Sequence, residues 1–195
     1  SIQSVFPQHW EQSLREALFN ITSIISGTGF ASVDYMTWGL FPVALFFFTG
    51  LIGGCAGSTA CSIKIFRYPL LFASIRAQLQ RIRSPHGIFT PRYDGRPVDA
   101  DVLGSVMSFF VFFVVSLGLL SVALGMTGLD FITSLSGAAT ALANIGPGLG
   151  DTIGPAGNFA PLPDTAKWML AAAMLIGRLE LMAVYVLFTF KFWRV

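Results

Sequence analysis

Two short glycine-containing segments carry the residues that could do chemistry in this sequence. They read Ser-Gly-Thr-Gly-Phe at 26–30 and Ala-Asn-Ile-Gly-Pro-Gly at 143–148. A turn of this kind can aim consecutive backbone carbonyl oxygens at one axis, where they replace the hydration shell of a monovalent cation. Glycine suits such a turn because its backbone conformations are closed to residues with a Cβ. The candidate ion-binding positions are Ser26, Gly27, Thr28, Gly29, Ala143, Asn144, Ile145 and Gly146.

Each segment follows a stretch that is apolar but too short to cross a bilayer. Residues 11–25 and 130–142 favour buried or re-entrant helices, because a spanning helix needs about 20 apolar residues. A shift of 117 positions pairs Gly29 with Gly146 and Asp34 with Asp151. A single copy would favour a glycine-rich extracellular turn, since isolated glycine signals are weak. Two copies in matching context favour a repeated unit of short helix, turn and spanning helix.

A third group of candidate residues lies between positions 53 and 62. The glycines and hydroxyls here disfavour an uninterrupted helix, so we expect an unwound loop inside the protein, on the cytoplasmic side of the two turns. A small-residue packing face is the alternative. A phosphate-binding loop is excluded because no lysine follows the last glycine. A serine hydrolase is disfavoured because His9 and His86 both lie outside the expected spans. The glycines and hydroxyl-bearing residues of this loop include Gly53, Gly54, Gly57, Ser58 and Thr59.

Arg178 and Glu180 are ionisable residues inside an otherwise apolar stretch. Such residues face a cavity or a partner by default. At two positions apart they point to different faces of a helix, so they do not pair with each other. A fixed positive charge raises the barrier for a cation, which makes Arg178 a gating candidate. A buried structural salt bridge is an equally weighted alternative.

The composition indicates that the elements carrying these residues lie in a membrane. The 195 residues are 54% hydrophobic and only 11% charged, against about 25% charged in soluble domains. This balance excludes a disordered chain, a nucleic-acid binder and a typical soluble enzyme. We expect an all-α membrane protein with spanning helices at 35–52, 102–126 and 168–190. Cys55 and Cys61 lack the spacing of a metal site, so no side-chain transition-metal site is expected.

The charges predict the orientation. Seven of the twelve basic residues lie between positions 64 and 96, whereas acidic residues dominate positions 127–167. By the positive-inside rule, 64–96 is cytoplasmic and 127–167 is extracytoplasmic.

Four motifs in this order resemble the C-terminal part of the TrkH family of potassium-uptake subunits, in the Trk/Ktr/HKT superfamily. They are the motifs at 26–30 and 143–148, Gly-Gly-Cys-Ala-Gly-Ser-Thr at 53–59, and Met-Leu-Ile-Gly-Arg-Leu-Glu at 174–180. The resemblance implies potassium-channel-like repeats of helix, pore helix and helix. Residues 1–97 would be a truncated third repeat and residues 98–195 a complete fourth repeat, so the chain would be a fragment.

The resemblance also implies a function and partners. Residues 26–29 and 143–146 would line a selectivity filter for K⁺, the transported ion. The loop at 53–62 and Arg178 would form its gate. The implied partners are the remaining repeats, a second copy of the subunit and a cytosolic, nucleotide-binding, TrkA-like regulatory subunit, in a bacterial inner membrane. The alternative is a noncatalytic membrane scaffold or assembly subunit whose short helices only pack.

Overall fold

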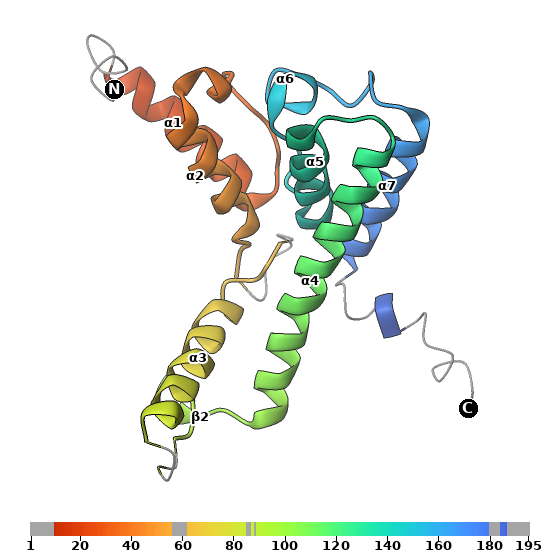
Figure 1. The fold of residues 1–195 in the computed structure, drawn as a ribbon. Helices are drawn as coiled ribbons and strands as arrows, with labels where there is room; N and C mark the ends of the chain where they lie inside the picture. Colours follow the sequence, from red (N-terminus) through yellow and green to blue (C-terminus); the bar gives the residue numbers. More distant parts are fainter. Residues whose placement is uncertain (1–9, 56–61, 85–86, 88, 180–183, 187–195) are drawn as a thin grey trace.

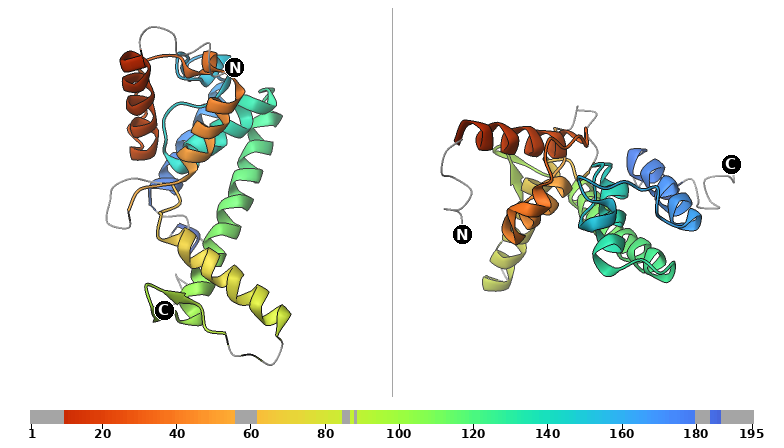
Figure 2. Two further views of the ribbon diagram at one scale, coloured as in Figure 1. Left: turned by 90° about the vertical axis from the view of Figure 1, so that its left-hand side faces the viewer. Right: turned by 90° about the horizontal axis from the view of Figure 1, so that it is seen from above.

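The computed structural model describes residues 10–55, 62–84, 87, 89–179 and 184–186. They form an almost entirely helical fold, in which α5 lies between α1 and α2 on one side and α4 and α7 on the other (Figures 1 and 2). A smaller group of elements, α3 and a two-stranded hairpin, lies at the N-terminal end of α4.

The two predicted short helices are present. Helix α1 covers Trp10–Ser26 and α5 covers Phe131–Ala143. Asp130 caps α5 as its sequence position indicates, because its carboxylate accepts a hydrogen bond from the Thr133 N–H at 3.1 Å. Such a cap satisfies one of the free N–H groups at a helix start.

The expected span at 35–52 is not one helix. A 3-10 helix, η2, covers Tyr35–Trp38, and α2 covers Leu40–Leu51. Gly39 separates them with a φ of 103°, a conformation that an α-helix cannot contain. The 12 residues of α2 span only about 18 Å, which is less than the thickness of a bilayer core.

Helix α4 agrees with the prediction for 102–126. It covers Ala100–Met126 and, in the part of the chain that the structure describes, is the one helix with the length and hydropathy to cross a membrane. Its exposed side chains include Val111, Val114 and Leu119. Such an apolar exposed surface suits contact with lipid.

The last predicted span begins earlier than expected. Helix α7 covers Asp164–Arg178, four residues ahead of the predicted start, and Leu179 forms its C-cap. Pro163 precedes the helix and Asp164 lies in its first turn, which are both start signals. Residues 184–186 are helical, whereas 180–183 and 187–195, including Glu180, lie outside the described residues.

The basic segment contains a helix and a hairpin. Helix α3 covers Arg67–Arg83, β1 covers Arg92–Tyr93 and β2 covers Arg96–Pro97. The strands pair antiparallel, with Arg92 opposite Pro97. Asp94 and Gly95 both have positive φ, as a two-residue hairpin turn requires. A short helix, α6, covers Gly150–Ile153 after α5.

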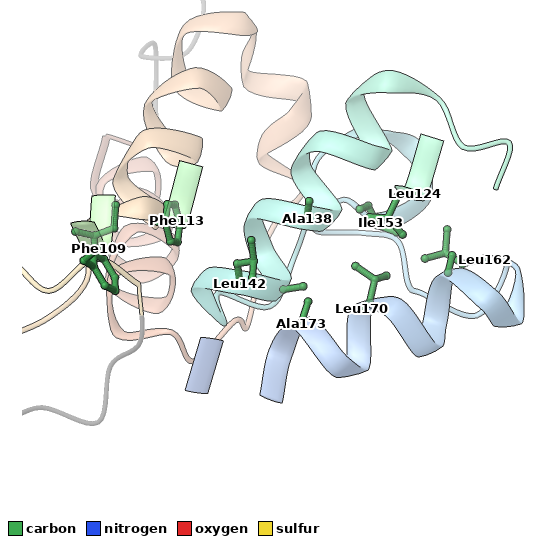
Figure 3. Packing of buried hydrophobic residues seen from close by; sticks show 12 residues of the cluster. Phe109, Phe113, Leu124, Ala138, Leu142, Ile153, Leu162, Leu170 and Ala173 are labelled. Atoms are coloured by element: carbon green, nitrogen blue, oxygen red, sulfur yellow. The ribbon is translucent and has the colours of Figure 1, made fainter. Parts of the chain in front are cut away.

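The main core joins α4, α5 and α7 (Figure 3). Helix α5 is buried along almost its whole length, and its small residues allow the neighbouring helices to approach closely. The core side chains from these helices include Phe109, Phe113, Leu124, Ala138, Ala141, Leu142, Ala166, Leu170 and Ala173.

A second cluster joins the first half of the chain to the second. It contains Ile24 of α1, Tyr35 of η2 and Phe46 of α2, packed with Ala143 and Ile145 at the end of α5. The Tyr35 and Phe46 rings meet edge to face, with centroids 4.6 Å apart. This cluster brings the chain that follows α1 against the chain that follows α5.

Candidate functional site

The first candidate segment turns sharply at the end of α1. Gly27 and Gly29 have φ values of 70° and 78°, in the left-handed region that favours glycine. The Gly27 N–H donates to the Ile24 carbonyl at 3.1 Å, and the Thr28 N–H donates to the Ser23 carbonyl at 3.0 Å. These bonds hold the turn onto the last turn of the helix.

The second segment repeats this geometry 117 positions later. Asn144 and Gly146 have φ values of 52° and 117°. The Asn144 N–H donates to the Ala141 carbonyl at 3.3 Å, and the Ile145 N–H donates to the Thr140 carbonyl at 3.0 Å. Helices α1 and α5 also end at equivalent positions. The sequence shift and the backbone geometry therefore agree.

The two segments lie backbone against backbone. A Cβ added at Gly29 would lie 2.8 Å from the Ile145 carbonyl oxygen, and one added at Gly146 would lie 2.7 Å from the Gly29 Cα. A Cβ at Gly27 would lie 3.1 Å from the Asn144 carbonyl oxygen. The carbonyl oxygens of the second segment therefore lie against the first, and Gly29 and Gly146 leave no room for a side chain.

Asn144 is a non-glycine residue in left-handed conformation, which asparagine tolerates better than most residues. Its side-chain amide donates to the Met174 carbonyl of α7 at 3.0 Å. Beside it, a Cβ added at Gly177 would collide with the Leu142 carbonyl oxygen. Helix α7 is thus in close backbone contact with the end of α5. Arg178 is the next residue in the sequence after the contacting Gly177.

The described residues on both sides of the predicted loop, 52–55 and 62–66, are not helical, and 56–61 lie outside the described residues. Helix α2 ends at Leu51 and α3 begins at Arg67. Between them, the Gly53 N–H donates to the Ile63 carbonyl at 2.9 Å and the Ile63 N–H donates to the Leu51 carbonyl at 3.2 Å. Of the candidate gating residues, Gly53 and Gly54 are described, whereas Gly57, Ser58 and Thr59 lie outside the described residues.

Ser62 connects this loop to the second segment, a contact that the sequence motifs did not indicate. Its hydroxyl oxygen lies 2.8 Å from the Gly50 carbonyl oxygen and 2.9 Å from the Ala143 carbonyl oxygen, so its one proton is shared between these two acceptors. Ala143 is the first residue of the second candidate segment. Ser62 has a φ of 67°, so its backbone occupies a conformation that serine rarely adopts.

The electrostatics at the start of α5 favour a negative charge there. Hydrogen bonds from the side chain and the backbone of Thr133 hold the pKa of Asp130 below its usual value. An ionised carboxylate at this position also interacts favourably with the positive end of the helix dipole.

The chain is similar to bacterial transport proteins over almost its whole length. The profile of the TrkH family, described as "Cation transport protein", matches residues 4–194. The "Trk system potassium uptake protein TrkI" of Halomonas elongata is 49% identical over 182 residues, covering 93% of this chain and 37% of the relative. The "Trk system potassium uptake protein TrkH" of Vibrio parahaemolyticus is 38% identical over 184 residues, covering 92% of this chain and 36% of the relative.

A solved structure has the same fold. The crystal structure of the potassium transporter TrkH from Vibrio parahaemolyticus superimposes with a TM-score of 0.86 at 35% identity, covering 94% of this chain and 39% of that chain. The chain therefore spans little more than a third of the length of these relatives. The fold is an all-α membrane fold of transporters, not of enzymes. From its sequence and its structure, the chain belongs to the TrkH family of cation transport proteins.

Proposed function

We propose that this chain supplies two segments of a selectivity filter in a transporter that carries K⁺ into bacteria across the inner membrane. The first segment is Ser26–Gly29 and the second is Ala143–Gly146. Their backbone carbonyl oxygens replace the water around a K⁺ ion, which is the cargo. The relatives named as potassium uptake proteins support this choice of ion.

One observation carries the proposal. Two turns with the same alternation of left-handed residues and the same helix-capping bonds lie in direct backbone contact. A glycine-rich turn that served only to connect two helices would need neither the match nor the contact. A filter needs both, because carbonyl groups from different repeats must reach one ion.

The short helices contribute to cation binding through their orientation. Each candidate segment begins at the C-terminal end of its helix, α1 or α5. That end carries a partial negative charge of about half an elementary charge, which attracts a cation. Ala143 and Ile145 of the second segment are buried, whereas Ser26, Gly27 and Thr28 of the first segment are exposed in this chain. Non-helical backbone at membrane depth must be covered by protein or line a water-filled cavity, so in this proposal the exposed backbone faces the ion path.

The gate in this proposal is the loop at 53–62 together with Arg178. Two contacts support it. The Ser62 hydroxyl ties the loop to Ala143, and Gly177, next to Arg178, packs against Leu142. A movement of the loop or of the end of α7 would therefore displace the backbone of the second filter segment through these contacts.

The complete assembly in this proposal contains more than this chain. Residues 1–97 and 98–195 act as two repeats, and further repeats complete the ring around the ion. The transporter is a homodimer in contact with membrane lipids. A cytosolic, nucleotide-binding, TrkA-like subunit docks on the inner face, where the segment 64–96 lies.

The substitution Gly146→Ala, made in the protein expressed from its complete gene, tests the filter. We expect it to abolish the growth of a potassium-uptake-deficient bacterium on low potassium. There are two reasons. The new Cβ would collide with the Gly29 backbone, and alanine would have to adopt the φ of 117° that Gly146 has. Growth at a series of potassium concentrations and the amount of protein in the membrane are measured together.

Gly128→Ala is the matched control. Gly128 also has a positive φ, 89°, but no atom of the described part of the chain lies within 4 Å of its added Cβ. We expect this variant to support growth. If Gly146→Ala grows as well as the control at equal protein levels, the filter assignment fails and the scaffold function is favoured.

A further inference from the structure

Buried hydroxyl groups on α5 hold the backbone of the second segment from behind. The Gly146 N–H donates to Thr140 Oγ1 at 3.0 Å. One turn earlier on the helix, Ser136 Oγ accepts the Leu149 N–H at 3.0 Å and donates to the Leu149 carbonyl at 3.3 Å. Thr140 and Ser136 are 2% and 4% exposed. These groups hold the segment at two points.

The first segment is held at the equivalent point by a different side chain. Ser32 lies 117 positions before Leu149, and its N–H donates to Asn20 Oδ1 at 3.1 Å. The Asn20 amide nitrogen donates to Ser32 Oγ at 3.0 Å and to the Glu16 carbonyl at 2.7 Å. Asn20 on α1 therefore holds the backbone after the first segment by hydrogen bonds, as Ser136 on α5 holds the backbone after the second.

The two segments differ in the hydrogen-bond acceptor of one glycine N–H, that of Gly29 in the first segment and that of Gly146 in the second. The Gly29 N–H donates to the Ser23 backbone carbonyl at 3.3 Å. Ser23 is equivalent to Thr140, yet its buried hydroxyl has no hydrogen-bond partner among the residues that the structure describes. Only the second segment has its glycine N–H held by a side chain, within the residues that the structure describes.

This hydrogen bond determines the direction of a carbonyl group. The Gly146 N–H and the Ile145 carbonyl belong to the peptide bond between these two residues, which is planar and trans. In a trans peptide the two groups point in opposite directions. Thr140 holds the N–H toward α5, so the Ile145 oxygen points toward the first segment, where it lies 2.8 Å from the Cβ position of Gly29.

We propose that Thr140 is a positioning residue for ion selectivity, which acts by preventing the Ile145–Gly146 peptide plane from rotating. The inference rests on the proposed filter function. Selection among alkali cations depends on the number and the arrangement of the carbonyl oxygens around the ion. A peptide plane free to rotate removes the Ile145 oxygen from that set part of the time, and the preference for K⁺ over Na⁺ falls.

The test compares Thr140→Val with Thr140→Ser in the protein expressed from its complete gene and reconstituted in vesicles. Uptake of Rb⁺, as a substitute for K⁺, and of Na⁺ is measured on the same preparations. We expect the Rb⁺/Na⁺ uptake ratio to fall about fivefold in the valine variant, roughly the factor given by one lost hydrogen bond. Serine keeps the acceptor and is expected to keep the ratio.

Thr165→Val is the matched control, because Thr165 is exposed on the first turn of α7. A purely structural role for Thr140 would lower both uptakes together and leave the ratio unchanged, which overturns the inference. Absence of Rb⁺ uptake by the unsubstituted protein overturns the proposed function instead. If the valine variant is missing from the membrane, Thr140→Ala takes its place. If both are missing while serine is present, the hydroxyl serves folding, and the positioning role is rejected.

Discussion

Asn20 shows how much a single buried side chain contributes to this fold. It is 1% exposed, and its amide makes three hydrogen bonds, to Ser32 and to the Glu16 carbonyl. Buried polar groups are tolerated only when they are satisfied in this way. Removing the amide leaves the Ser32 N–H without its acceptor.

Asn20→Ala is therefore expected to destabilise the protein by about 2–4 kcal/mol, because it removes three hydrogen bonds that each contribute about 0.5–1.5 kcal/mol. Thermal unfolding in detergent measures the change. Asn158→Ala is the matched control, since Asn158 is exposed and accepts one hydrogen bond, from the Ala160 N–H. Equal unfolding temperatures for the two variants would show that Asn20 does not stabilise the segment.

At this scale, the sequence predicted the glycines of the two turns but not their supporting residues. Gly29 and Gly146 were recognisable because the repeat pairs them. Asn144 was expected in the segment, but its side-chain hydrogen bond to the Met174 carbonyl forms only because α7 packs beside it. Local sequence carries no signal for a partner 30 residues away.

Among the elements, the short helices were predicted well and the longer spans less well. Asp130 marks the start of α5, and the glycines mark the ends of α1 and α5. Hydropathy alone predicted one span at 35–52, because it does not register the φ of 103° at Gly39. The hairpin was not predicted although Asp94 and Gly95 are a strong turn signal, since the basic residues around them were considered for the orientation of the chain.

Among the helix contacts, the one between α5 and α7 leaves no space for an added side-chain atom at Gly177, so we expect the stability of the protein to be sensitive to substitution there. We expect Gly177→Ala to destabilise the protein by about 1–3 kcal/mol, as overpacking does. The added Cβ would meet the Leu142 carbonyl, which belongs to the backbone and cannot rotate away. The unfolding temperature of the purified protein gives the measurement.

Gly118→Ala in α4 is the corresponding control, because none of the described residues has an atom within 4 Å of its added Cβ. This variant is expected to be neutral, or more stable by up to about 1 kcal/mol through the higher helix propensity of alanine. If the two substitutions have the same effect, the close approach of α7 to α5 does not exist in the membrane.

Over the whole molecule, charge is separated along α4. The basic α3 and the hairpin lie at its N-terminal end, and the turn into α5 lies at the other end (Figure 1). The 27 residues of α4 extend about 40 Å, enough to cross a bilayer. This arrangement agrees with the predicted orientation, with 64–96 in the cytoplasm.

Single cysteines test the orientation after Cys55 and Cys61 have been replaced by alanine. A membrane-impermeant maleimide is expected to label Asp164→Cys in intact cells, but Arg83→Cys only after lysis. Both side chains are exposed in this chain. The reverse pattern of labelling would contradict the orientation.

The contact between Gly29 and Gly146 has a consequence for how such a protein can be tuned. Main-chain atoms meet there with no side chain between them, so the width of the gap depends on atomic radii and not on rotamers. No substitution at the two glycines can adjust that width by a small amount. A small change in that width therefore requires a shift of a whole helix, so the substitutions that can make it lie on the packed faces of α1 and α5, away from the two glycines.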